Sequence, residues 1–361
     1  MLNIGVIHGF VGGGGGTEKT LLTILEALEE TNHKVTLYTF SKPKLSFKKI
    51  TVKSLIPISI PAFGLYQRVM ESNLISKAKN EDVIIQASGG FAVPENPKQK
   101  IIVYCHSDFS SELEKTITKY KGIWGKYYKI YYEKTKQTLE KINQENILLL
   151  SNSKYVQNSL EKIYGKKSSL LYPPLDLSEF NQNISKKKSL ICISRFSSEK
   201  NLEFVIDAVK NLSIDSIIIG NTKTKSNEIY YNLLDSKIKK EMHSSNIVLL
   251  KNISRKNLLA HLLESKVYFH ASPETFGLTI VEGISAGCIP IVPDNSAHKE
   301  TVPFSELRYE PNDISNAQEK IKQALSGSFD NLMIPLKDSI QKYDKEQFKK
   351  SFVSIIDSFS N

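Results

Sequence analysis

The sequence predicts an α/β protein with two doubly wound parallel sheets, one in each half of the chain, and a cleft between the halves. Short apolar runs alternate with longer amphipathic segments, and this alternation stops once and then begins again. Strands that are apolar on both faces and separated by helices are typical of parallel sheets covered by helices on each side. A chain of 361 residues is also longer than a single hydrophobic core usually organises.

The first half begins with the apolar run Leu2–His8, which we interpret as a buried strand. It has neither the basic segment nor the cleavage site of a signal peptide. The predicted strands of this half are Leu2–His8, Lys34–Phe40, Asp82–Ala87, Ile101–His106, Asn146–Asn152 and Ser168–Tyr172. Its predicted helices are Thr17–Thr31, Glu112–Tyr120, Ile123–Ile142 and Lys154–Tyr164.

The pattern stops at Pro173–Pro174, and a polar, basic stretch from Ser178 to Lys188 follows. The predicted strands after it are Ser189–Ser194, Ile214–Gly220, Asn246–Leu250, Val267–His270 and Cys288–Val292. The predicted helices are Leu202–Leu212, Ser226–Met242, Arg255–Leu263, one from about Leu278, and Lys345–Phe359. We therefore predict an amino-terminal domain of residues 1–174 and a carboxyl-terminal domain of residues 187–335.

The composition favours an anionic partner. Lys and Arg together number 48 against 38 Asp and Glu, a net charge of +10. A phosphate ligand, an anionic membrane or a nucleic acid would each fit. We do not expect nucleic acid, because no nucleic-acid-binding module is recognisable and the cations are spread along the chain. Three scattered cysteines (Cys105, Cys192 and Cys288) form no disulfide framework or metal-binding spacing, which favours a cytoplasmic location.

An unbroken glycine run, Gly12 to Gly16, follows the first predicted strand and precedes the first helix. Glycines let backbone N–H groups approach a ligand at a helix amino terminus, where negative charge is favoured. The run is not a P-loop, because Glu18 stands before Lys19-Thr20, and it lacks the spacing of a dinucleotide-binding loop. We expect a ligand-facing loop; the alternative is a merely flexible one.

Two glutamates, Glu274 and Glu282, lie in the segment Pro-Glu-Thr-Phe-Gly-Leu-Thr-Ile-Val-Glu-Gly, the first before a predicted helix and the second within it. Such carboxylates can hold hydroxyl groups while the helix amino terminus holds phosphate. The alternative is that Glu274 is an ordinary loop acid and Glu282 a solvated helix residue.

Three cationic or titratable side chains follow predicted strands, where ligands gather in open α/β sheets. Arg195 and Lys200 come just after the first strand of the second half, and this pair suits a diphosphate. His106 ends a strand of the first half, at the same sheet edge as the glycine run. The alternatives are ordinary surface cations and a structural histidine.

Together these motifs resemble glycosyltransferase family 4, retaining enzymes with the GT-B fold of two Rossmann-like domains. Glu274 and Glu282 match the family's Glu-x7-Glu signature, and Arg195 and Lys200 match its Arg-x4-Lys pair. The segment Gly-Gly-Gly-Gly-Thr-Glu-Lys-Thr-Leu-Leu, the segment Leu-Tyr-Pro-Pro-Leu-Asp and the pair Asn295-Ser296 are similar to the branch that mannosylates dolichol-linked oligosaccharides.

The resemblance implies a role for each donor-site residue. Arg195 and Lys200 would neutralise the donor diphosphate, with help from backbone amides. Glu282 would hold the donor ribose, and Glu274 would hold a hydroxyl of the transferred sugar. The residues whose amides would contact the diphosphate are Gly277, Leu278 and Thr279.

It also implies roles in the first half and a mechanism. His106 would lie beside the anomeric centre, and the loop of Gly13, Gly14, Gly15 and Gly16 near the phosphates and the acceptor. Transfer would occur with front-face departure and attack, and the leaving phosphate would help to deprotonate the acceptor. No cofactor or metal is expected, and the chain has no Asp-x-Asp sequence. The helix 345–359 would pack back on the first domain.

The sequence departs from the family pattern at two places. Gly283 stands where the family usually has alanine, and the stretch from Asp294 to Glu300 lacks the family's paired glycines. The second departure leaves the details of the sugar pocket open.

Residues 119–136 combine six lysines with five tyrosines and Trp124. Aromatic rings and lysines at helical spacing suit an anionic membrane surface. The alternative is a helix that buries its aromatic rings against the first domain. The sequence has no run of about 18 uninterrupted apolar residues, the length needed to cross a bilayer.

We therefore predict a cytoplasmic glycosyltransferase peripheral to a membrane. It would move a hexose, with mannose from GDP-mannose favoured, to a lipid-linked saccharide or another glycan. The alternatives are the same fold using UDP-glucose or UDP-N-acetylglucosamine, and a sugar-nucleotide epimerase or hydrolase. A basic nucleic-acid-binding protein is the least favoured.

Overall fold

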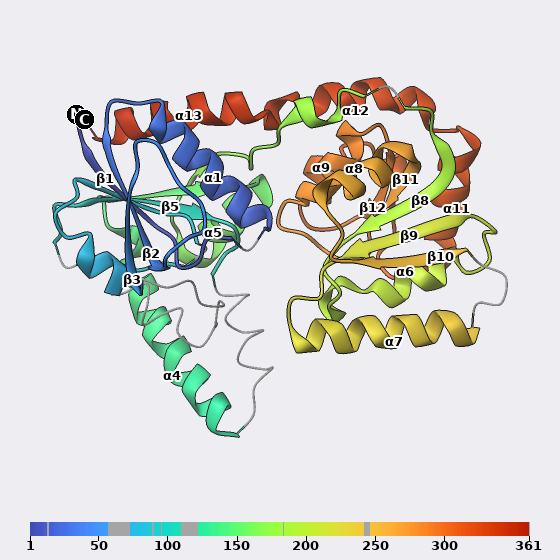
Figure 1. The fold of residues 1–361 in the computed structure, drawn as a ribbon, viewed down its shortest axis with the longest axis horizontal. Helices are drawn as coiled ribbons and strands as arrows, with labels where there is room; N and C mark the ends of the chain where they lie inside the picture. Colours follow the sequence, from blue (N-terminus) through green and yellow to red (C-terminus); the bar gives the residue numbers. More distant parts are fainter. Residues whose placement is uncertain are drawn as a thin grey trace. The chain divides into compact units, whose positions relative to one another are not determined.

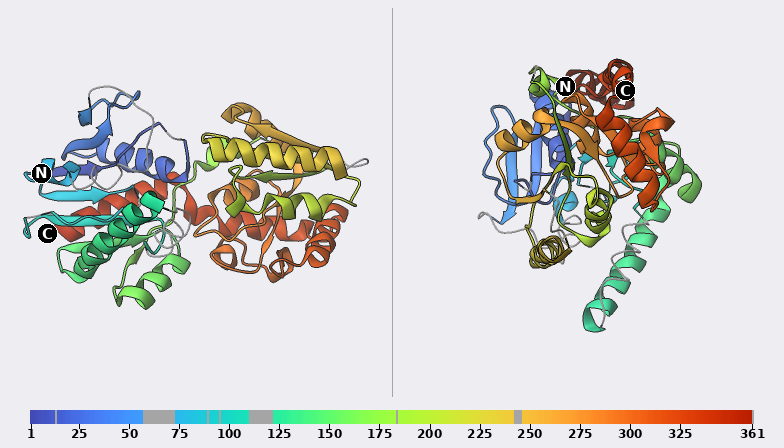
Figure 2. Two further views of the ribbon diagram at one scale, coloured as in Figure 1. Left: turned by 90° about the horizontal axis from the view of Figure 1, so that it is seen from below. Right: turned by 90° about the vertical axis from the view of Figure 1, so that its right-hand side faces the viewer.

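The computed structural model describes residues 1–12, 14–56, 73–88, 90–94, 96–109, 122–182, 184–241 and 246–360. The chain forms two compact units (Figures 1 and 2). Unit 1 contains Met1–Pro174 and Lys345–Asn361, and unit 2 contains Leu175–Asp344. The predicted fold class is confirmed, because each unit holds a sheet in which all named strands pair in parallel.

The sheet of unit 1 has the strand order β3-β2-β1-β4-β5-β6-β7. Its strands are β1 (Asn3–Ile7), β2 (Lys34–Ser41), β3 (Thr51–Ile56), β4 (Val83–Gln86), β5 (Lys100–Cys105), β6 (Ile147–Ser151) and β7 (Ser169–Leu170). Its helices are α1 (Gly16–Glu29), α4 (Gly122–Leu139), α5 (Lys154–Tyr164) and α13 (Lys345–Ser360). The order reverses between β1 and β4, which is where ligands bind in open α/β sheets.

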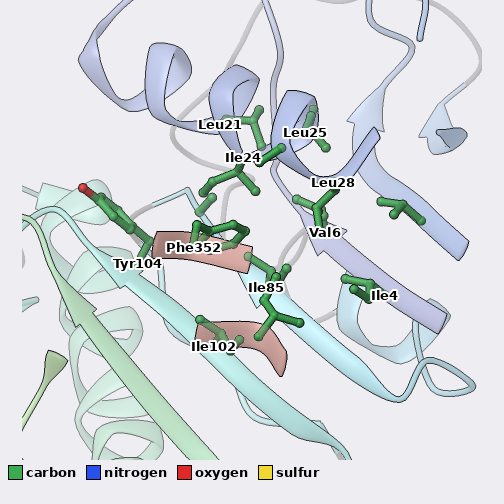
Figure 3. Close-up of a cluster of buried hydrophobic side chains, with 14 of the residues drawn as sticks. Ile4, Val6, Leu21, Ile24, Leu25, Leu28, Ile85, Ile102, Tyr104 and Phe352 are labelled. Carbon is green, nitrogen blue, oxygen red and sulfur yellow. The ribbon is translucent and has the colours of Figure 1, made fainter. Parts of the chain in front are cut away.

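The core of unit 1 joins segments from both ends of the chain. Figure 3 shows Phe352, from α13, among side chains of α1 and of the central strands. Phe348, Phe352 and Ile356 repeat at helical spacing and are all buried in this cluster. Burial of this apolar stripe is what attaches the carboxyl-terminal helix to the amino-terminal sheet.

The sheet of unit 2 has the order β10-β9-β8-β11-β12-β13. Its strands are β8 (Lys187–Ile193), β9 (Asp215–Gly220), β10 (Ile247–Lys251), β11 (Ser265–Phe269), β12 (Ile289–Pro293) and β13 (Arg308–Tyr309). Its helices are α6 (Leu202–Val209), α7 (Lys225–Glu241), α8 (Arg255–Glu264), α9 (Leu278–Ser285), α10 (His298–Thr301), α11 (Ile314–Ser326) and α12 (Met333–Ser339). The order reverses between β8 and β11.

Several elements differ from the sequence-based expectation. Strand β3 was not predicted, because its side chains are exposed or half-buried and its apolar pattern is weak. Helix α11 was not predicted either, although Asp313 caps its start and Gly327 ends it. The basic stretch after Pro174 includes a short 3-10 helix, η3 (Leu177–Phe180), whose Phe180 is buried. The predicted helix Glu112–Tyr120 lies outside the described residues.

Candidate functional site

The candidate site of unit 2 lies at the carboxyl ends of β8, β11 and β12. These strands are neighbours in the sheet, and the strand order reverses between β8 and β11. The segments that follow the three strands carry Lys200, Glu274 and Ser296 respectively. The parallel sheet thus brings together polar residues that are far apart in sequence.

Lys200 and Glu274 form an ion pair at this edge. The Nζ atom of Lys200 lies 2.5 Å from Oε1 of Glu274, and the two side chains are 16% and 21% exposed. Lys200 ends a short 3-10 turn (Ser198–Lys200), and Asn201 after it adopts left-handed backbone geometry with φ 50°. The pair is protected from water on most sides, which strengthens its attraction.

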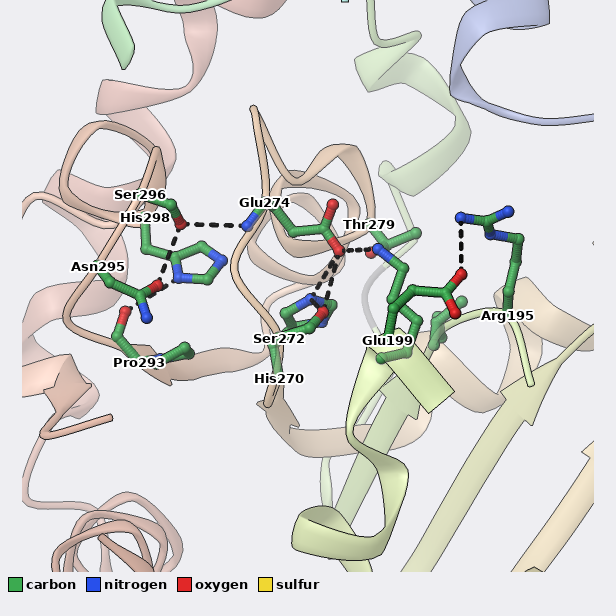
Figure 4. A network of polar contacts seen from close by, with 12 residues as sticks. Arg195, Glu199, His270, Ser272, Glu274, Thr279, Pro293, Asn295, Ser296 and His298 are labelled. Atoms are coloured by element: carbon green, nitrogen blue, oxygen red, sulfur yellow. Dashed lines mark hydrogen bonds and ion pairs between the residues drawn. The ribbon is translucent and has the colours of Figure 1, made fainter. Parts of the chain in front are cut away.

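Three donors converge on one oxygen of Glu274 (Figure 4). Besides Lys200, His270 Nε2 lies 3.0 Å and Ser272 Oγ 3.3 Å from Oε1. Burial alone would raise the pKa of Glu274, but His270 and Lys200 outweigh it and hold that pKa well below its ordinary value. The carboxylate is therefore ionised, and its Oε2 has no partner in the part of the chain that the structure describes.

The loop after β12 fixes the backbone of Glu274. Ser296 Oγ accepts a hydrogen bond of 3.1 Å from the Glu274 amide, and the Ala297 amide donates one of 3.1 Å to the Glu274 carbonyl. Ser296 has a left-handed φ of 50°, a backbone conformation that costs free energy for residues other than glycine. Of the pair Asn295-Ser296, Ser296 thus contacts Glu274, and its hydroxyl donates a hydrogen bond to Asn295 Oδ1.

Helix α9 begins beside this network, and no side chain of the described residues caps its amino terminus. Its N-cap residue, Gly277, has φ 88°, and a Cβ there would lie 2.7 Å from Ile280 Cδ1. No acidic residue lies in the first turn, where Leu278 and Thr279 stand. The backbone amides and the helix dipole at this end favour an anion.

Glu282, one turn into α9, is buried and paired differently. Its side chain is 3% exposed, and its Oε1 lies 2.9 Å from Nη2 of Arg255. Arg255 also contacts Glu179 at 2.5 Å, so one guanidinium joins two carboxylates. The pKa of the buried Tyr268 is raised, first by burial and then by Cys192, with Glu282 and Glu274 both contributing.

Arg195 lies apart from the ion pair of Lys200. Its side chain is 59% exposed, and its Nη2 is 3.4 Å from Oε1 of Glu199 (Figure 4). A surface pair of this kind contributes little to stability and is easily rearranged. The Arg195 side chain can therefore reorient to contact a ligand.

His8 and His106 directly follow strands β1 and β5 of unit 1. His106 Nε2 lies 3.3 Å from the Ala87 carbonyl, and its ring packs 4.9 Å from that of Tyr104. Burial lowers the pKa of His106 to about 4, so its ring is neutral at neutral pH. Burial also lowers the pKa of His8 to about 4, and neither of its ring nitrogens has a hydrogen-bond partner within the described ranges.

The glycine run is folded around an acid of its own helix. Gly13 lies outside the described residues, Gly15 is the N-cap of α1, and Gly16 begins that helix. The amides of Gly12 and Gly14 donate to the two carboxylate oxygens of Glu18. Two amides of this loop thus contact a carboxylate, but this carboxylate belongs to the chain itself.

Sequence reasoning missed several residues of these networks. His270 and Ser272 could have been found from their place after β11, since His106 was found in that way. Arg255 and Glu18 gave no comparable signal, because their partners are distant or appear only in the folded loop. Within the described ranges, no three Asp, Glu, His or Cys side chains are grouped closely enough to hold a metal.

Two family models match consecutive parts of the chain. Residues 14–179 match Glycosyltransferase Family 4, and residues 176–347 match glycosyl transferases group 1. The first match covers most of the amino-terminal segment of unit 1 and ends at residue 179, just inside unit 2, and the second covers most of unit 2.

Known proteins are similar at low sequence identity. A Dictyostelium discoideum protein described as GDP-Man:Man(3)GlcNAc(2)-PP-Dol alpha-1,2-mannosyltransferase is 22% identical over 280 residues, which are 70% of this chain and 53% of that protein. The chain thus spans about half the length of this curated relative.

Solved structures share the fold. Sucrose-phosphate synthase from Thermosynechococcus elongatus aligns with a TM-score of 0.79 at 14% identity, over 99% of each chain. Anabaena Alr3699/HepE, in complex with UDP and glucose, aligns with a TM-score of 0.72 at 15% identity, over 99% of this chain and 100% of that one.

Proposed function

We propose that this chain, which belongs to the glycosyltransferases built from a family 4 domain and a group 1 domain, transfers a hexose from a sugar nucleotide to a glycan acceptor. The observation that carries the proposal is the Lys200–Glu274 pair beside the uncapped start of α9. A cation, an ionised carboxylate and free helix amides at a sheet edge suit a ligand with both phosphate and hydroxyl groups.

We assign the donor diphosphate to the cations and the helix end. Arg195 is exposed and weakly paired, and the ion partner of Lys200 among the described residues is the Glu274 carboxylate, so both cations can turn to a phosphate. The amides around Gly277, Leu278 and Thr279 would receive the same group. Binding then requires Lys200 to leave Glu274, at least in part.

We assign the sugar to Glu274 and the ribose to Glu282. Oε2 of Glu274 can accept a hydrogen bond from a sugar hydroxyl, because Oε1 holds the described donors. Glu282 would share its carboxylate between Arg255 and the ribose diol. An ionised Glu274 cannot donate a proton, so its role is to accept hydrogen bonds and to stabilise positive charge on the sugar.

In the proposed reaction the bond between the anomeric carbon and the diphosphate oxygen breaks, and a bond from the acceptor oxygen to that carbon forms on the same face. The acceptor proton passes to the leaving phosphate oxygen, and the configuration is retained. The cations and helix amides stabilise the departing charge. We propose that no metal is needed, and that the neutral His106 lies beside the reacting carbon.

For the donor and acceptor we propose mannose from GDP-mannose and a lipid-linked saccharide. The support is the name of the Dictyostelium discoideum relative, which mentions GDP-Man and a PP-Dol acceptor. A UDP-sugar is the second candidate, because the Anabaena structure contains UDP and glucose. In both cases the donor site would be the one described.

We further propose that α4 rests on an anionic membrane surface at its cytoplasmic face. Figure 1 shows α4 extending away from the sheet of unit 1. Lys126 and Lys129 are exposed, and Ile130 is 61% exposed. Cations beside an exposed apolar side chain suit a charged interface.

The aromatic side chains Trp124, Tyr127, Tyr128 and Tyr131 lie outside the described part, and so do residues 119–121. No described helix is long and apolar enough to cross a bilayer.

A donor screen tests the proposal. The unfolding temperature is measured with GDP, with UDP and with the corresponding sugar nucleotides. In a separate assay, with and without a chelator, the products formed with lipid-linked acceptors are analysed. We expect a rise in the unfolding temperature with one nucleotide series and transfer that survives the chelator. No shift with any nucleotide would contradict the proposal.

Two variants refine the test, each with a matched surface control. Glu274→Ala should abolish transfer, whereas the exposed Glu319→Ala should not.

Lys200→Ala should weaken binding of the nucleoside diphosphate, whereas the exposed Lys322→Ala should leave it unchanged. Full turnover by Glu274→Ala would remove the role given to that carboxylate.

A further inference from the structure

We infer that His270 is a positioning residue, which holds the carboxylate of Glu274 in place when Lys200 turns to the donor diphosphate. The inference rests on the proposed function, because it concerns the exchange of partners that donor binding requires. It assigns a role to a buried side chain that the proposed reaction does not otherwise use.

The ring of His270 is held rigidly at the end of β11. Its side chain is 3% exposed, and it lies parallel to the Tyr268 ring, with 6.3 Å between centroids and 12° between planes. The Tyr309 hydroxyl donates a hydrogen bond of 2.9 Å to the His270 carbonyl. A rigid ring offers its N–H in a fixed direction, which a flexible lysine cannot do.

The proton position follows from the charge of Glu274. Since that carboxylate is ionised, it only accepts hydrogen bonds, and Nε2 of His270 must carry the hydrogen. Nε2 also lies 3.1 Å from Ser272 Oγ, whereas Nδ1 is buried without a partner in the described part of the chain. The ring is thus oriented toward Glu274 even though its other nitrogen goes unpaired, which is uncommon for buried polar atoms.

The geometry of Oε1 explains why this donor matters. Lys200, His270 and Ser272 all contact Oε1, at 2.5, 3.0 and 3.3 Å. When Lys200 leaves, His270 supplies the shorter of the two remaining contacts. Without it, the carboxylate could rotate after Lys200 and would compete with the diphosphate for the ammonium. Oε2 would then no longer be oriented to accept a hydrogen bond from the sugar hydroxyl.

Two variants separate the donor from the ring. His270→Phe keeps an aromatic ring of similar size and removes the N–H, whereas His270→Gln restores an N–H at a similar distance from the backbone. We expect His270→Phe to lower kcat by roughly 10-fold or more, as expected for loss of a hydrogen bond to a charged group. We expect His270→Gln to recover most of that loss.

His298→Phe is the matched control. The His298 ring is also buried and lies 5.7 Å from that of His270, but its Nδ1 contacts the Pro293 carbonyl and not Glu274. For each variant the unfolding temperature, kcat, and the affinities for the nucleoside diphosphate and for its sugar are measured. The affinity for the sugar nucleotide, relative to that for the nucleoside diphosphate, should fall only for His270→Phe. The reason is that, in the proposed complex, Oε2 of Glu274 contacts the sugar and not the diphosphate.

The outcomes distinguish the two claims. If the wild-type protein turns over and His270→Phe matches it in kcat and in the affinity ratio, the positioning role is wrong and the proposed function stands. Equal losses in His270→Phe and His298→Phe, without recovery in His270→Gln, would also overturn the positioning role. A wild-type protein that binds no sugar nucleotide would overturn the proposed function and this inference with it.

Discussion

Glu274 illustrates how a single carboxylate can be buried and still charged. Burial opposes its charge, but a histidine, a lysine and a serine all contact the same oxygen. The resulting pKa lies well below the ordinary value of 4.5. This residue is therefore poised to accept a hydrogen bond, and it is not suited to act as an acid.

The lowered pKa of Glu274 predicts a pH dependence of stability. A carboxyl group with a lower pKa in the folded state stabilises the fold fully above its ordinary pKa of 4.5, and this contribution is lost as the pH falls toward the folded-state value. The wild-type unfolding temperature should therefore fall below pH 4.5 more steeply than that of Glu274→Gln, in scans from about pH 7 to pH 3.

The exposed Glu319→Gln is the control for this experiment, since its side chain is solvated. It should follow the wild-type pH profile. Parallel profiles for wild type and Glu274→Gln would show that the carboxylate does not contribute in this way.

At the scale of the element, helix α9 is shaped by a close contact with β11. A Cβ at Gly283 would lie 2.8 Å from the ring of Tyr268, whose hydroxyl lies 2.7 Å from Thr279 Oγ1. The glycine that departs from the family's usual alanine thus makes room for a large buried ring. The departure is a local adjustment of packing beside the site.

We predict that Gly283→Ala destabilises the protein by about 1–3 kcal/mol, the usual cost of overpacking. The sign is informative, because alanine in a helix interior is ordinarily favoured over glycine by about 1 kcal/mol. Chemical denaturation followed by circular dichroism measures the difference. Ser285→Ala, in the same helix, should change stability by less; a stabilised Gly283→Ala would mean that the ring moves aside freely.

At the scale of the whole molecule, the last helix belongs to the core of the first unit. Residues 345–361 group with residues 1–174, and residues 175–344 form a unit of their own. Each unit has its own parallel sheet, but unit 1 is complete only when both ends of the chain are present. Stability of unit 1 should therefore depend on residues of α13.

Phe352→Ala tests this dependence. Phe352 is fully buried, and its truncation should cost about 3–5 kcal/mol. Hydrogen exchange should quicken in β1, β4 and β5 of unit 1 while protection in unit 2 is kept. The exposed Ile334→Ala serves as the control. Equal loss of protection in both units would mean that they unfold together.

The membrane proposal also belongs to this scale. Reversal of two exposed cations of α4, Lys126→Glu with Lys129→Glu, should weaken binding to anionic vesicles at least about tenfold, since each cation near such a surface contributes about 1 kcal/mol. Co-sedimentation with vesicles measures it. The pair Lys154→Glu with Lys162→Glu makes the same charge change on α5 and should bind like the wild type; equal weakening by both pairs would indicate an unspecific effect of charge.

Much of the fold could be predicted because it follows from local patterns. Buried parallel strands contain continuous apolar runs, so β1, β5 and β8 stand out in the sequence. Strand β3 was not predicted because its side chains are exposed or half-buried and its apolar pattern is weak. The site was partly predictable, because polar residues after strands meet at one sheet edge, as Lys200 and Glu274 do.

The sequence alone determined the two α/β halves and the residue types of a diphosphate and hydroxyl site, because apolar periodicity and motif spacing are local properties of the chain. Only the tertiary structure decided which partners those residues have: His270 with Glu274, Arg255 with Glu282, and Glu18 with the glycine loop. Such contacts depend on distances across a sheet or between loops, and those distances come into existence only when the chain folds.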